Sequence, residues 1–254
     1  MSDEIVLVTG AAHGIGLACA QRFAAEGYAV ALVDRDDSAL SAALATLPEG
    51  TKAEIFPGDV ADAAQVERIV AEAETALGPI TALVTSAGII RAKPSFEVSP
   101  EEFREHLDIN VTGSFLYAQA VGKRMAQRGG GSIVMIGSVY GASGAPLRAA
   151  YCASKGAVHN LVAALSVEWG ELGIRVNAVA PTGTRTAMVQ GLIDQGIYNL
   201  DGVRGRTPLR RLAEPEEIAD GCFFLASKHA GMISGHVLPV DGGLLSNGYP
   251  TVLS

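Results

Sequence analysis

The chain has 254 residues, of which 48% are hydrophobic and 18% are charged, and its formal net charge is -8 at pH 7. This composition is typical of a folded protein with a substantial core and excludes a largely disordered chain. The negative charge argues against general nucleic-acid binding, because that function needs a basic surface. We expect no signal peptide and no membrane partner, because no apolar stretch is long enough to span a bilayer.

The three cysteines, Cys19, Cys152 and Cys222, are scattered along the chain and lack the spacing of metal ligands. They indicate free thiols in a reducing compartment rather than a disulfide framework. We therefore expect a cytoplasmic protein that has no metal site.

Apolar stretches of strand length alternate with helical patterns along the chain. This alternation predicts an α/β, Rossmann-type doubly wound fold, with a seven-stranded, mostly parallel sheet and helices on both faces. No linker or repeat interrupts it, so we expect residues 1–254 to form a single domain for dinucleotide binding and catalysis. The expected strands are residues 5–9, 29–33, 53–57, 80–84, 132–137, 174–180 and 236–240. The expected helices are residues 15–26, 37–46, 62–76, 100–127, 151–171 and 215–226.

The turn after the first expected strand contains three glycines, in the sequence Thr9-Gly10-Ala11-Ala12-His13-Gly14-Ile15-Gly16. Glycines between a strand and a helix allow a tight turn and bring a pyrophosphate close to the helix N-terminus. A glycine turn can also be purely structural, but this one lies where a dinucleotide site requires it. The predicted cofactor-binding residues in this turn are Gly10, His13, Gly14, Ile15 and Gly16.

Acidic residues follow the second and third expected strands. The Asp34 carboxylate can accept hydrogen bonds from an adenosine ribose and would repel a 2′-phosphate, which favours NAD and makes NADP less likely. Arg35 is a counter-signal, since its guanidinium could pair with that phosphate, stack on the adenine or stay solvated. Asp59, followed by Val60, could contact the adenine amino group or cap the helix that begins near Asp62.

Tyr151 and Lys155 lie four residues apart, so on a helix they share one face, and Ser138 lies thirteen positions before Tyr151 at the end of a strand. An ammonium near a phenol favours the phenolate, so we expect the pKa of Tyr151 to fall from about 10 towards neutrality. Such a phenol can donate or accept a proton at working pH. Asn110 lies within an expected helix, where it could mark a kink or a water site or be an ordinary exposed asparagine.

Taken together, these motifs resemble the short-chain dehydrogenases/reductases in their single-domain form. The resemblance implies an NAD(P)-dependent oxidoreductase that transfers a hydride between a nicotinamide cofactor and a secondary alcohol or ketone. The matching residues are Thr9-Gly10-x-x-x-Gly14-x-Gly16, Asp59, Ala87-Gly88, Asn110, Ser138, Tyr151-x-x-x-Lys155 and Val240-Asp241-Gly242-Gly243.

The resemblance implies a catalytic tetrad of Asn110, Ser138, Tyr151 and Lys155. Tyr151 would be the general acid in ketone reduction and the general base in alcohol oxidation, and Ser138 would bond the substrate oxygen. Lys155 would hold the nicotinamide ribose, and Asn110 would retain a water that links Lys155 to solvent. The remaining cofactor-binding residues that it implies are Ala87, Gly88, Pro181, Thr182, Gly183, Thr184 and Thr186.

The chain departs from the family pattern at two places. After the fourth strand, Thr85-Ser86 replaces a pair of asparagines, and threonine can restore one of the lost hydrogen bonds. After the sixth strand, Thr182 replaces a glycine, so we expect its side chain to face the nicotinamide amide or the substrate pocket and to narrow it.

Substrate selection in this family lies after the sixth strand, here at about residues 186–212, where glycines suggest a mobile lid and a long surface loop is the alternative. We interpret the substrate as a sugar, polyol or similar small hydroxy compound. The alternatives are a 3-oxoacyl thioester (acyl carrier protein) reductase and a non-catalytic dinucleotide-binding regulatory protein. The resemblance also implies a homotetramer. The candidate substrate-pocket residues are Tyr140, Ser143, Arg148, Met188 and Val189.

Overall fold

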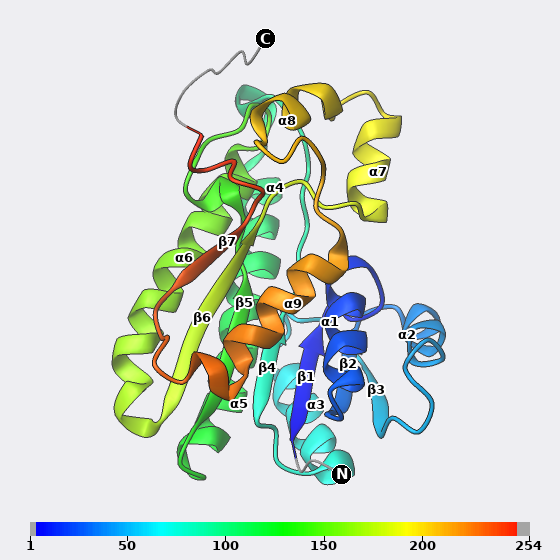
Figure 1. Ribbon diagram of the computed structural model, residues 1–254, viewed down its shortest axis with the longest axis vertical. Helices are drawn as coiled ribbons and strands as arrows, with labels where there is room; N and C mark the ends of the chain where they lie inside the picture. The colour runs from blue at the N-terminus through cyan, green and yellow to red at the C-terminus, as the bar shows by residue number, and fades with distance from the viewer. Residues whose placement is uncertain (1–3, 248–254) are drawn as a thin grey trace.

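The computed structural model describes residues 4–247, which form a seven-stranded parallel sheet with strand order β3-β2-β1-β4-β5-β6-β7 (Figure 1). The predicted Rossmann-type doubly wound sheet is therefore confirmed, and all of its strand pairs are parallel. The strands are β1 Ile5–Thr9, β2 Ala29–Asp34, β3 Ala53–Pro57, β4 Ala82–Thr85, β5 Gly131–Ile136, β6 Ile174–Pro181 and β7 Val237–Val240.

Apolar side chains alternate across the sheet and divide the core into two layers, because successive side chains of a strand point to opposite faces. In β1, Ile5 and Leu7 belong to one layer, and Val6 and Val8 belong to the other. Both faces are buried, which explains why the central strands read as continuous apolar runs rather than as alternating ones.

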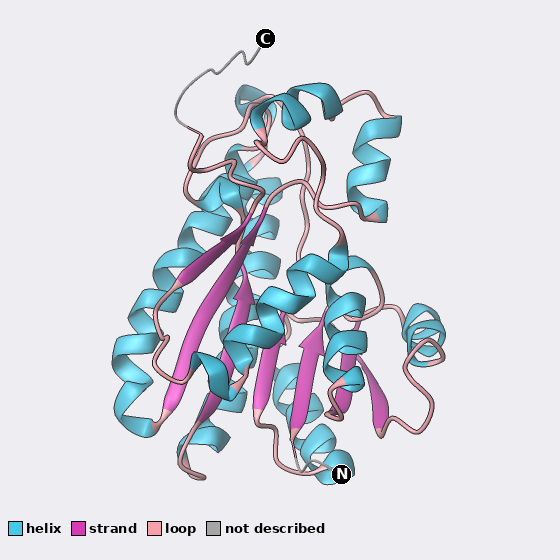
Figure 2. Cartoon of the chain, in the orientation of Figure 1, coloured by secondary structure: helices cyan, strands magenta, loops and turns pink. Residues whose placement is uncertain are grey.

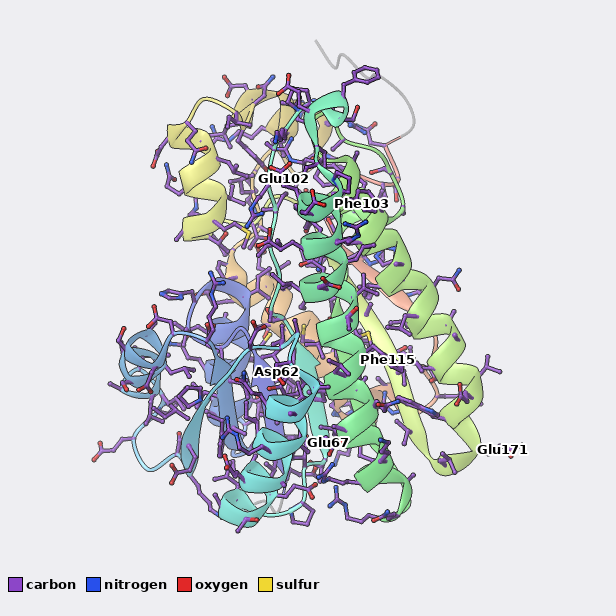
Figure 3. All side chains as sticks on the ribbon, turned by 180° about the vertical axis from the view of Figure 1, so that it is seen from behind. Asp62, Glu67, Glu102, Phe103, Phe115 and Glu171 are labelled. Carbon is purple, nitrogen blue, oxygen red and sulfur yellow. The ribbon has the colours of Figure 1, made fainter. Side chains whose placement is uncertain are left out.

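Helices cover both faces of the sheet (Figures 1 and 2). Residues of α1, α2 and α9 pack in one core layer, and residues of α3, α5 and α6 pack in the other. Figure 3 shows this second face, with Asp62 at the start of α3 and Phe115 on α5. The helices are α1 Gly14–Ala25, α2 Asp37–Leu44, α3 Ala63–Leu77, α4 Pro100–Leu107, α5 Gly113–Ala126, α6 Ala149–Trp169, α7 Ala187–Asp194, α8 Leu200–Arg206 and α9 Pro215–Ala226.

The single helix predicted at residues 100–127 is wrong, because a five-residue π-helical turn at Asp108–Thr112 separates α4 from α5. Asn110 lies in this turn and is fully buried. Its side-chain oxygen accepts a hydrogen bond from the Ile89 amide (2.8 Å), and its side-chain nitrogen donates to the Ile89 carbonyl (3.0 Å). The predicted kink is thus confirmed, and the alternative of an exposed asparagine is wrong.

All seven strands run in the same direction, so their carboxyl ends meet at one edge of the sheet, below α7 and α8 (Figure 1). The segment that carries α7 and α8 leaves and rejoins the body through one short stem. There, the Ala213 amide donates to the Gly183 carbonyl (3.0 Å), and the Arg185 amide donates to the Ala213 carbonyl (2.8 Å). Within residues 4–247, no helix is long and apolar enough to cross a membrane.

Candidate active site

The glycine-rich turn leads from β1 into α1 and leaves no room for side chains. Gly10 has a φ of 67°, and a Cβ atom there would lie 2.7 Å from the Ala87 amide nitrogen. A Cβ atom on Gly16 would overlap the carbonyl oxygen of Gly10. Gly14 has a φ of 55° and faces the Thr186 methyl group, where a Cβ atom would lie at 3.1 Å. The turn therefore brings bare backbone to the N-terminus of α1, as a pyrophosphate site requires.

The Asp34 carboxylate stands at the end of β2 beside this turn. It accepts hydrogen bonds from the amides of Ala12 (3.3 Å) and Arg35 (2.8 Å). The Arg35 side chain is exposed and forms no ion pair with the residues that the structure describes. A negative charge rather than a positive one therefore faces the glycine turn at this point.

Asp59 does not cap the helix that follows it, so that alternative is wrong. The N-cap of α3 is Asp62, whose carboxylate accepts from the amides of Ala64 and Gln65. Asp59 instead accepts a hydrogen bond from the Ala61 amide (2.9 Å), which closes its own turn. The next residue, Val60, is buried and packs closely on Gly113. A Cβ atom added to Gly113 would lie 2.7 Å from the Cγ2 atom of Val60.

The end of β4 forms the floor between the glycine turn and the catalytic candidates. The Thr9 hydroxyl accepts from the amides of Ser86 (3.1 Å) and Ala87 (3.2 Å) and so anchors this segment. Thr85 is buried, but its hydroxyl has no hydrogen-bond partner among residues 4–247. The expectation that threonine restores a lost hydrogen bond here is therefore wrong, because the Thr85 hydroxyl reaches no acceptor.

The four predicted catalytic residues come together where β4, β5, the π-helical turn and α6 meet. Lys155 Nζ lies 5.7 Å from the centroid of the Tyr151 ring and donates to the carbonyl oxygen of Ile136 (2.7 Å). A Cβ atom on Gly88 would lie 3.1 Å from the Asn110 side-chain oxygen and 3.8 Å from Lys155 Nζ. Ser138 lies at the end of β5 and hydrogen-bonds with Tyr151.

The expected fall in the pKa of Tyr151 is not what this structure gives. Burial removes water from the phenol and raises the pKa of Tyr151 to about 12, although the hydrogen bond with Ser138 opposes the shift. Burial also lowers the pKa of Lys155 to about 8. The expectation was wrong because it counted the attraction between ammonium and phenolate and neglected desolvation of both groups. In the chain by itself, Tyr151 holds its proton at neutral pH.

Two residues near the cluster were not predicted. His159 lies one helical turn beyond Lys155, and its Nε2 atom accepts a hydrogen bond from the Ser138 amide (3.4 Å). Burial lowers the pKa of His159, and the nearby Lys155 charge lowers it further. The Ser154 hydroxyl accepts from the Asn110 side chain (2.9 Å). The signal for His159 was its spacing, since residues 151, 155 and 159 repeat every four positions along α6.

The segment after β6 turns from the sheet into α7. Thr186 is the N-cap of α7, and its hydroxyl accepts from the Val189 amide (3.3 Å). The Thr184 hydroxyl donates to the Thr182 carbonyl (3.0 Å). Gly183 lies against Tyr198, whose hydroxyl a Cβ atom at Gly183 would overlap. Tyr198, between α7 and α8, therefore closes over the end of β6, whose last residue is Pro181.

The candidate pocket residues differ in how well they are placed. Ser143 is partly buried and donates its hydroxyl to the Val139 carbonyl (2.9 Å), so that proton is committed to the backbone. Met188 is 51% exposed, and Val189 is half-buried. Arg148 is buried, and Tyr140, half-buried, donates its amide to the Ser138 hydroxyl (3.1 Å). Tyr140 and Arg148 are therefore the two candidates nearest the catalytic cluster.

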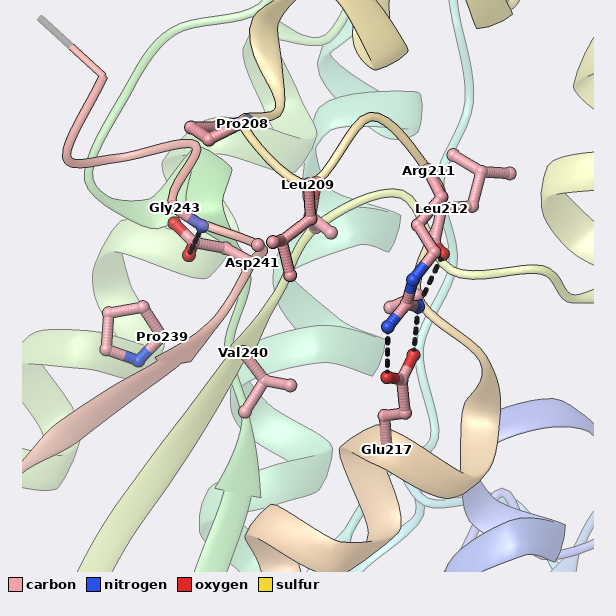
Figure 4. A pocket seen from close by; sticks show the side chains of 12 residues that line it. Pro208, Leu209, Arg211, Leu212, Glu217, Pro239, Val240, Asp241 and Gly243 are labelled. Carbon is pink, nitrogen blue, oxygen red and sulfur yellow. Dashed lines mark hydrogen bonds and ion pairs between the residues drawn. The ribbon is translucent and has the colours of Figure 1, made fainter.

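A pocket of about 580 Å³ opens between the end of β7 and the segment that rejoins α9 (Figure 4). Arg211 and Glu217 face each other at one side of it as an ion pair (2.6 Å), and Leu209 and Val240 supply apolar walls. None of the four catalytic candidates lines this pocket. Thr182 does line it, with a buried hydroxyl that has no partner among the described residues, so its expected effect on the substrate pocket stays a prediction.

Known proteins resemble the chain over nearly its whole length. A family profile described as enoyl-(acyl carrier protein) reductase matches residues 10–245. D-threitol dehydrogenase of Mycolicibacterium smegmatis is 40% identical over 249 residues, which cover 96% of this chain and 93% of that protein. Galactitol 2-dehydrogenase (L-tagatose-forming) of Cereibacter sphaeroides is 40% identical over 238 residues, which cover 93% of this chain and 92% of that protein.

A solved structure agrees with these sequence matches. The crystal structure of a gluconate 5-dehydrogenase from Burkholderia cenocepacia, in complex with NADP and tartrate, superposes with a TM-score of 0.90. It is 34% identical, and the match covers 97% of this chain and 96% of that chain. The chain is therefore an oxidoreductase that belongs to the short-chain dehydrogenase/reductase family.

Proposed function

We propose that the protein is a nicotinamide-dependent dehydrogenase of a small secondary alcohol, a sugar, polyol or similar hydroxy compound. The observation that carries the proposal is the convergence of Tyr151, Lys155, Ser138 and Asn110 at the carboxyl edge of the sheet, beside a glycine-rich turn. Relatives named for threitol and galactitol oxidation, each 40% identical, support this substrate class.

The bare backbone of the glycine turn fits a dinucleotide, because a side chain at Gly10, Gly14 or Gly16 would fill the space against Ala87, Thr186 or the turn itself. The cofactor, when bound, supplies the acceptor or donor of the hydride. In this proposal the turn, Asp34, Asp59, Ala87–Gly88 and the 181–186 segment hold it. Asp34 makes NAD the preferred form, because its carboxylate would repel a 2′-phosphate.

Tyr151 exchanges the proton of the substrate oxygen. With a pKa of about 12 it is protonated at neutral pH, so the chain by itself has the general acid that ketone reduction needs. Ser138, in hydrogen-bonding contact with Tyr151, orients that oxygen and stabilises the charge that develops on it. In alcohol oxidation Tyr151 must be the phenolate, which accepts the proton of the substrate hydroxyl and becomes the phenol, and the Lys155 ammonium stabilises that phenolate.

Lys155 and Asn110 complete the proton path in this proposal. With a pKa of about 8, the Lys155 amine is mostly protonated at pH 7, and it can release its proton at a pH only slightly higher. Asn110 holds the π-helical turn beside Gly88 through its two hydrogen bonds to Ile89. This turn presents main-chain groups near Lys155 that a water can bridge to solvent.

The direct test follows reduced-nicotinamide absorbance while the protein is incubated with NAD and a panel of polyols and sugars. We expect turnover that Tyr151→Phe lowers by about 10³-fold, within the range for loss of a general acid-base group. NADH binding, measured by fluorescence, should survive in that variant. Turnover that persists in Tyr151→Phe would contradict the assignment. Turnover of 3-oxoacyl thioesters alone would replace the alcohol proposal by the reductase alternative.

The same proposal includes one catalytic unit over the whole chain, with residues 186–212 as the substrate lid, and assembly as a homotetramer. Apolar side chains remain exposed on the outer helices, for example Val167 at 83% and Phe103 at 36%, and they offer surface for association. Light scattering tests the assembly, and the mass of a monomer would defeat it.

A further inference from the structure

Arg148 is the one buried arginine among the described residues, at 8% exposure. Its Nη1 atom donates one hydrogen bond, to the Pro146 carbonyl (3.0 Å), and no carboxylate of residues 4–247 pairs with it. By contrast, Arg91 and Arg211, both well exposed, pair with glutamates. A guanidinium has five donors, and none of the other Arg148 nitrogens is among the fully buried atoms without a partner, so they reach space that water or a ligand can occupy. Residues 4–247 therefore hold this cation in place without supplying a counter-charge.

The surroundings of Arg148 are polar but contain no acid. Its charge lowers the pKa of both Tyr151 and Tyr198, in each case against a larger rise from burial. Tyr140 acts on the same two phenols, and no carboxylate does. Arg148 thus lies near enough for its charge to act on both the catalytic phenol and Tyr198, whose hydroxyl lies against Gly183. These are neutral hydrogen-bonding groups around one positive charge.

The backbone holds Arg148 in this place at some cost. The preceding residue, Leu147, has a φ of 63°, a left-handed conformation that is unfavourable for leucine. The Lys93 amide fixes it by donating to the Leu147 carbonyl (2.8 Å). Arg148 is itself the N-cap of α6, which has no side-chain cap and no acidic residue in its first turn. The helix dipole therefore adds to the positive potential next to Tyr151.

We propose that Arg148 binds a carboxylate of the substrate, so that the preferred substrate is a hydroxy acid, such as a sugar acid, rather than a neutral polyol. This inference rests on the dehydrogenase function proposed above. The carboxylate takes no part in the proton or hydride transfer. It selects which hydroxyl of the chain-like substrate reaches Tyr151, because Arg148 lies three residues before Tyr151 on the same first turn of α6. Planar carboxylates suit a guanidinium, which can donate two parallel hydrogen bonds.

The experiment compares matched pairs that differ in one carboxylate: D-gluconate with D-glucitol, D-galactonate with galactitol, and D-threonate with D-threitol. Binding to the NADH-saturated protein is measured by calorimetry, and KM and kcat are measured with NAD. The variants are Arg148→Gln, which removes the charge, and Arg148→Lys, which keeps it. Arg68→Gln, on an exposed arginine of α3 that pairs with Glu72, is the matched control. Unfolding curves verify that each variant is folded.

We expect the wild type to bind at least one acid tenfold or more tightly than its neutral partner. Arg148→Gln should weaken acid binding by about 30-fold and leave polyol binding within about twofold, through KM rather than kcat. Arg148→Lys should keep part of the preference, and Arg68→Gln should keep all of it. If Arg148→Gln does not fold, a reduced preference for acids in Arg148→Lys supports the inference, because lysine keeps the charge but loses the two parallel hydrogen bonds. A preference that Arg148→Lys leaves unchanged contradicts the bidentate pairing.

Equal binding of acids and polyols by the wild type, or a preference that survives Arg148→Gln, would overturn the inference. Tyr151-dependent turnover of neutral polyols with no preference for acids would overturn it while leaving the proposed function intact. Selective acid binding through Arg148 without any Tyr151-dependent turnover would support the anion site and count against the dehydrogenase function alone.

Discussion

The two halves of the catalytic edge are built in opposite ways. The nucleotide half, from the ends of β1 to β4, consists largely of backbone, with Gly10, Gly14 and Gly16 packed so closely that side chains do not fit. The substrate half, from the end of β5 to α8, consists of large side chains such as Tyr151 and Arg148, at the start of α6, and Tyr198, between α7 and α8. The nucleotide half thus depends on the absence of side chains, and the substrate half depends on large side chains.

This difference explains why the nucleotide half has a short local sequence motif and the substrate half does not. A backbone cradle requires glycine at fixed spacing within one turn, since only that residue tolerates the conformation and the close approach. A side-chain pocket can be assembled from many residue types and positions, provided that they meet in space. The following predictions test the contrast between the two halves, beginning with the largest expected effect.

A single methyl group should damage the nucleotide half and leave the substrate half unaffected. In Gly16→Ala the new Cβ atom overlaps the Gly10 carbonyl, so we expect the free energy of unfolding to fall by about 3 kcal/mol. We also expect this variant to show no measurable NADH binding. The matched change Gly191→Ala, in α7, meets no atom within 4 Å and should be neutral or stabilise by up to about 1 kcal/mol. Urea unfolding that ranks the two variants alike would break the comparison.

The stability of the protein should depend on pH through the substrate half, because burial removes water from the ionisable side chain of Lys155. The pKa of Lys155 is about 8 in the folded chain and 10.5 ordinarily, so between these values the unfolded chain binds more protons. The free energy of unfolding of the wild type should therefore rise with pH. Between pH 7.5 and 9.5 this rise should be about 2 kcal/mol larger in the wild type than in Lys155→Met. The raised pKa of Tyr151 acts only above about pH 10.

Denaturant unfolding of both proteins at the two pH values measures this difference. Lys123→Met, on the exposed side of α5, serves as the control for loss of a charge and should follow the wild type. Parallel pH profiles for the wild type and Lys155→Met would show that Lys155 is not desolvated.

Asp34 is the exception in the nucleotide half, since there we propose that a side chain rather than backbone selects between NAD and NADP. Asp34→Ala should lower the ratio of kcat/KM for NAD to that for NADP by tenfold or more, because the carboxylate no longer bonds the ribose or repels a phosphate. Asp37→Ala, at the first residue of α2, is the matched control. An unchanged ratio would mean that Asp34 does not face the ribose.

The smallest effect should come from two threonines that face each other in register on neighbouring strands, Thr9 and Thr85. Thr85→Val removes a buried hydroxyl without a partner, so it should stabilise by up to about 1 kcal/mol. Thr9→Val removes the acceptor of the Ser86 and Ala87 amides and should destabilise by about 1–2 kcal/mol. Thermal unfolding that showed the opposite order would mean that the Thr85 hydroxyl has a partner.

The sequence predicted the strands to within two residues, because buried parallel strands read as apolar runs bounded by polar turns. It predicted one helix over residues 100–127 and offered a kink at Asn110 only as one alternative, because residues on both sides of Asp108–Thr112 favour a helix. The cause of the kink lies in Ile89, a loop residue 21 positions earlier, whose backbone bonds the Asn110 side chain. Local patterns carry no information about such a contact.

The catalytic candidates could be identified from spacing, yet the sign of the Tyr151 pKa shift could not. The shift depends on how much water the surrounding residues exclude, and no short motif records this. Arg148 illustrates the same limit. Its position before Tyr151 was visible in the chain, but only the fold reveals that it is buried without an acidic neighbour.

The stem at Gly183, Arg185 and Ala213 has a consequence for the segment that it closes. Because the residues that flank the 186–212 segment are hydrogen-bonded to each other, the segment is a loop that leaves the sheet and returns to it at one point. Closure of a longer or shorter loop on fixed ends changes the entropy of the chain only slowly with length. A segment of another length and sequence can therefore be closed on the same stem at little entropic cost, while the glycine turn after β1 stays unchanged.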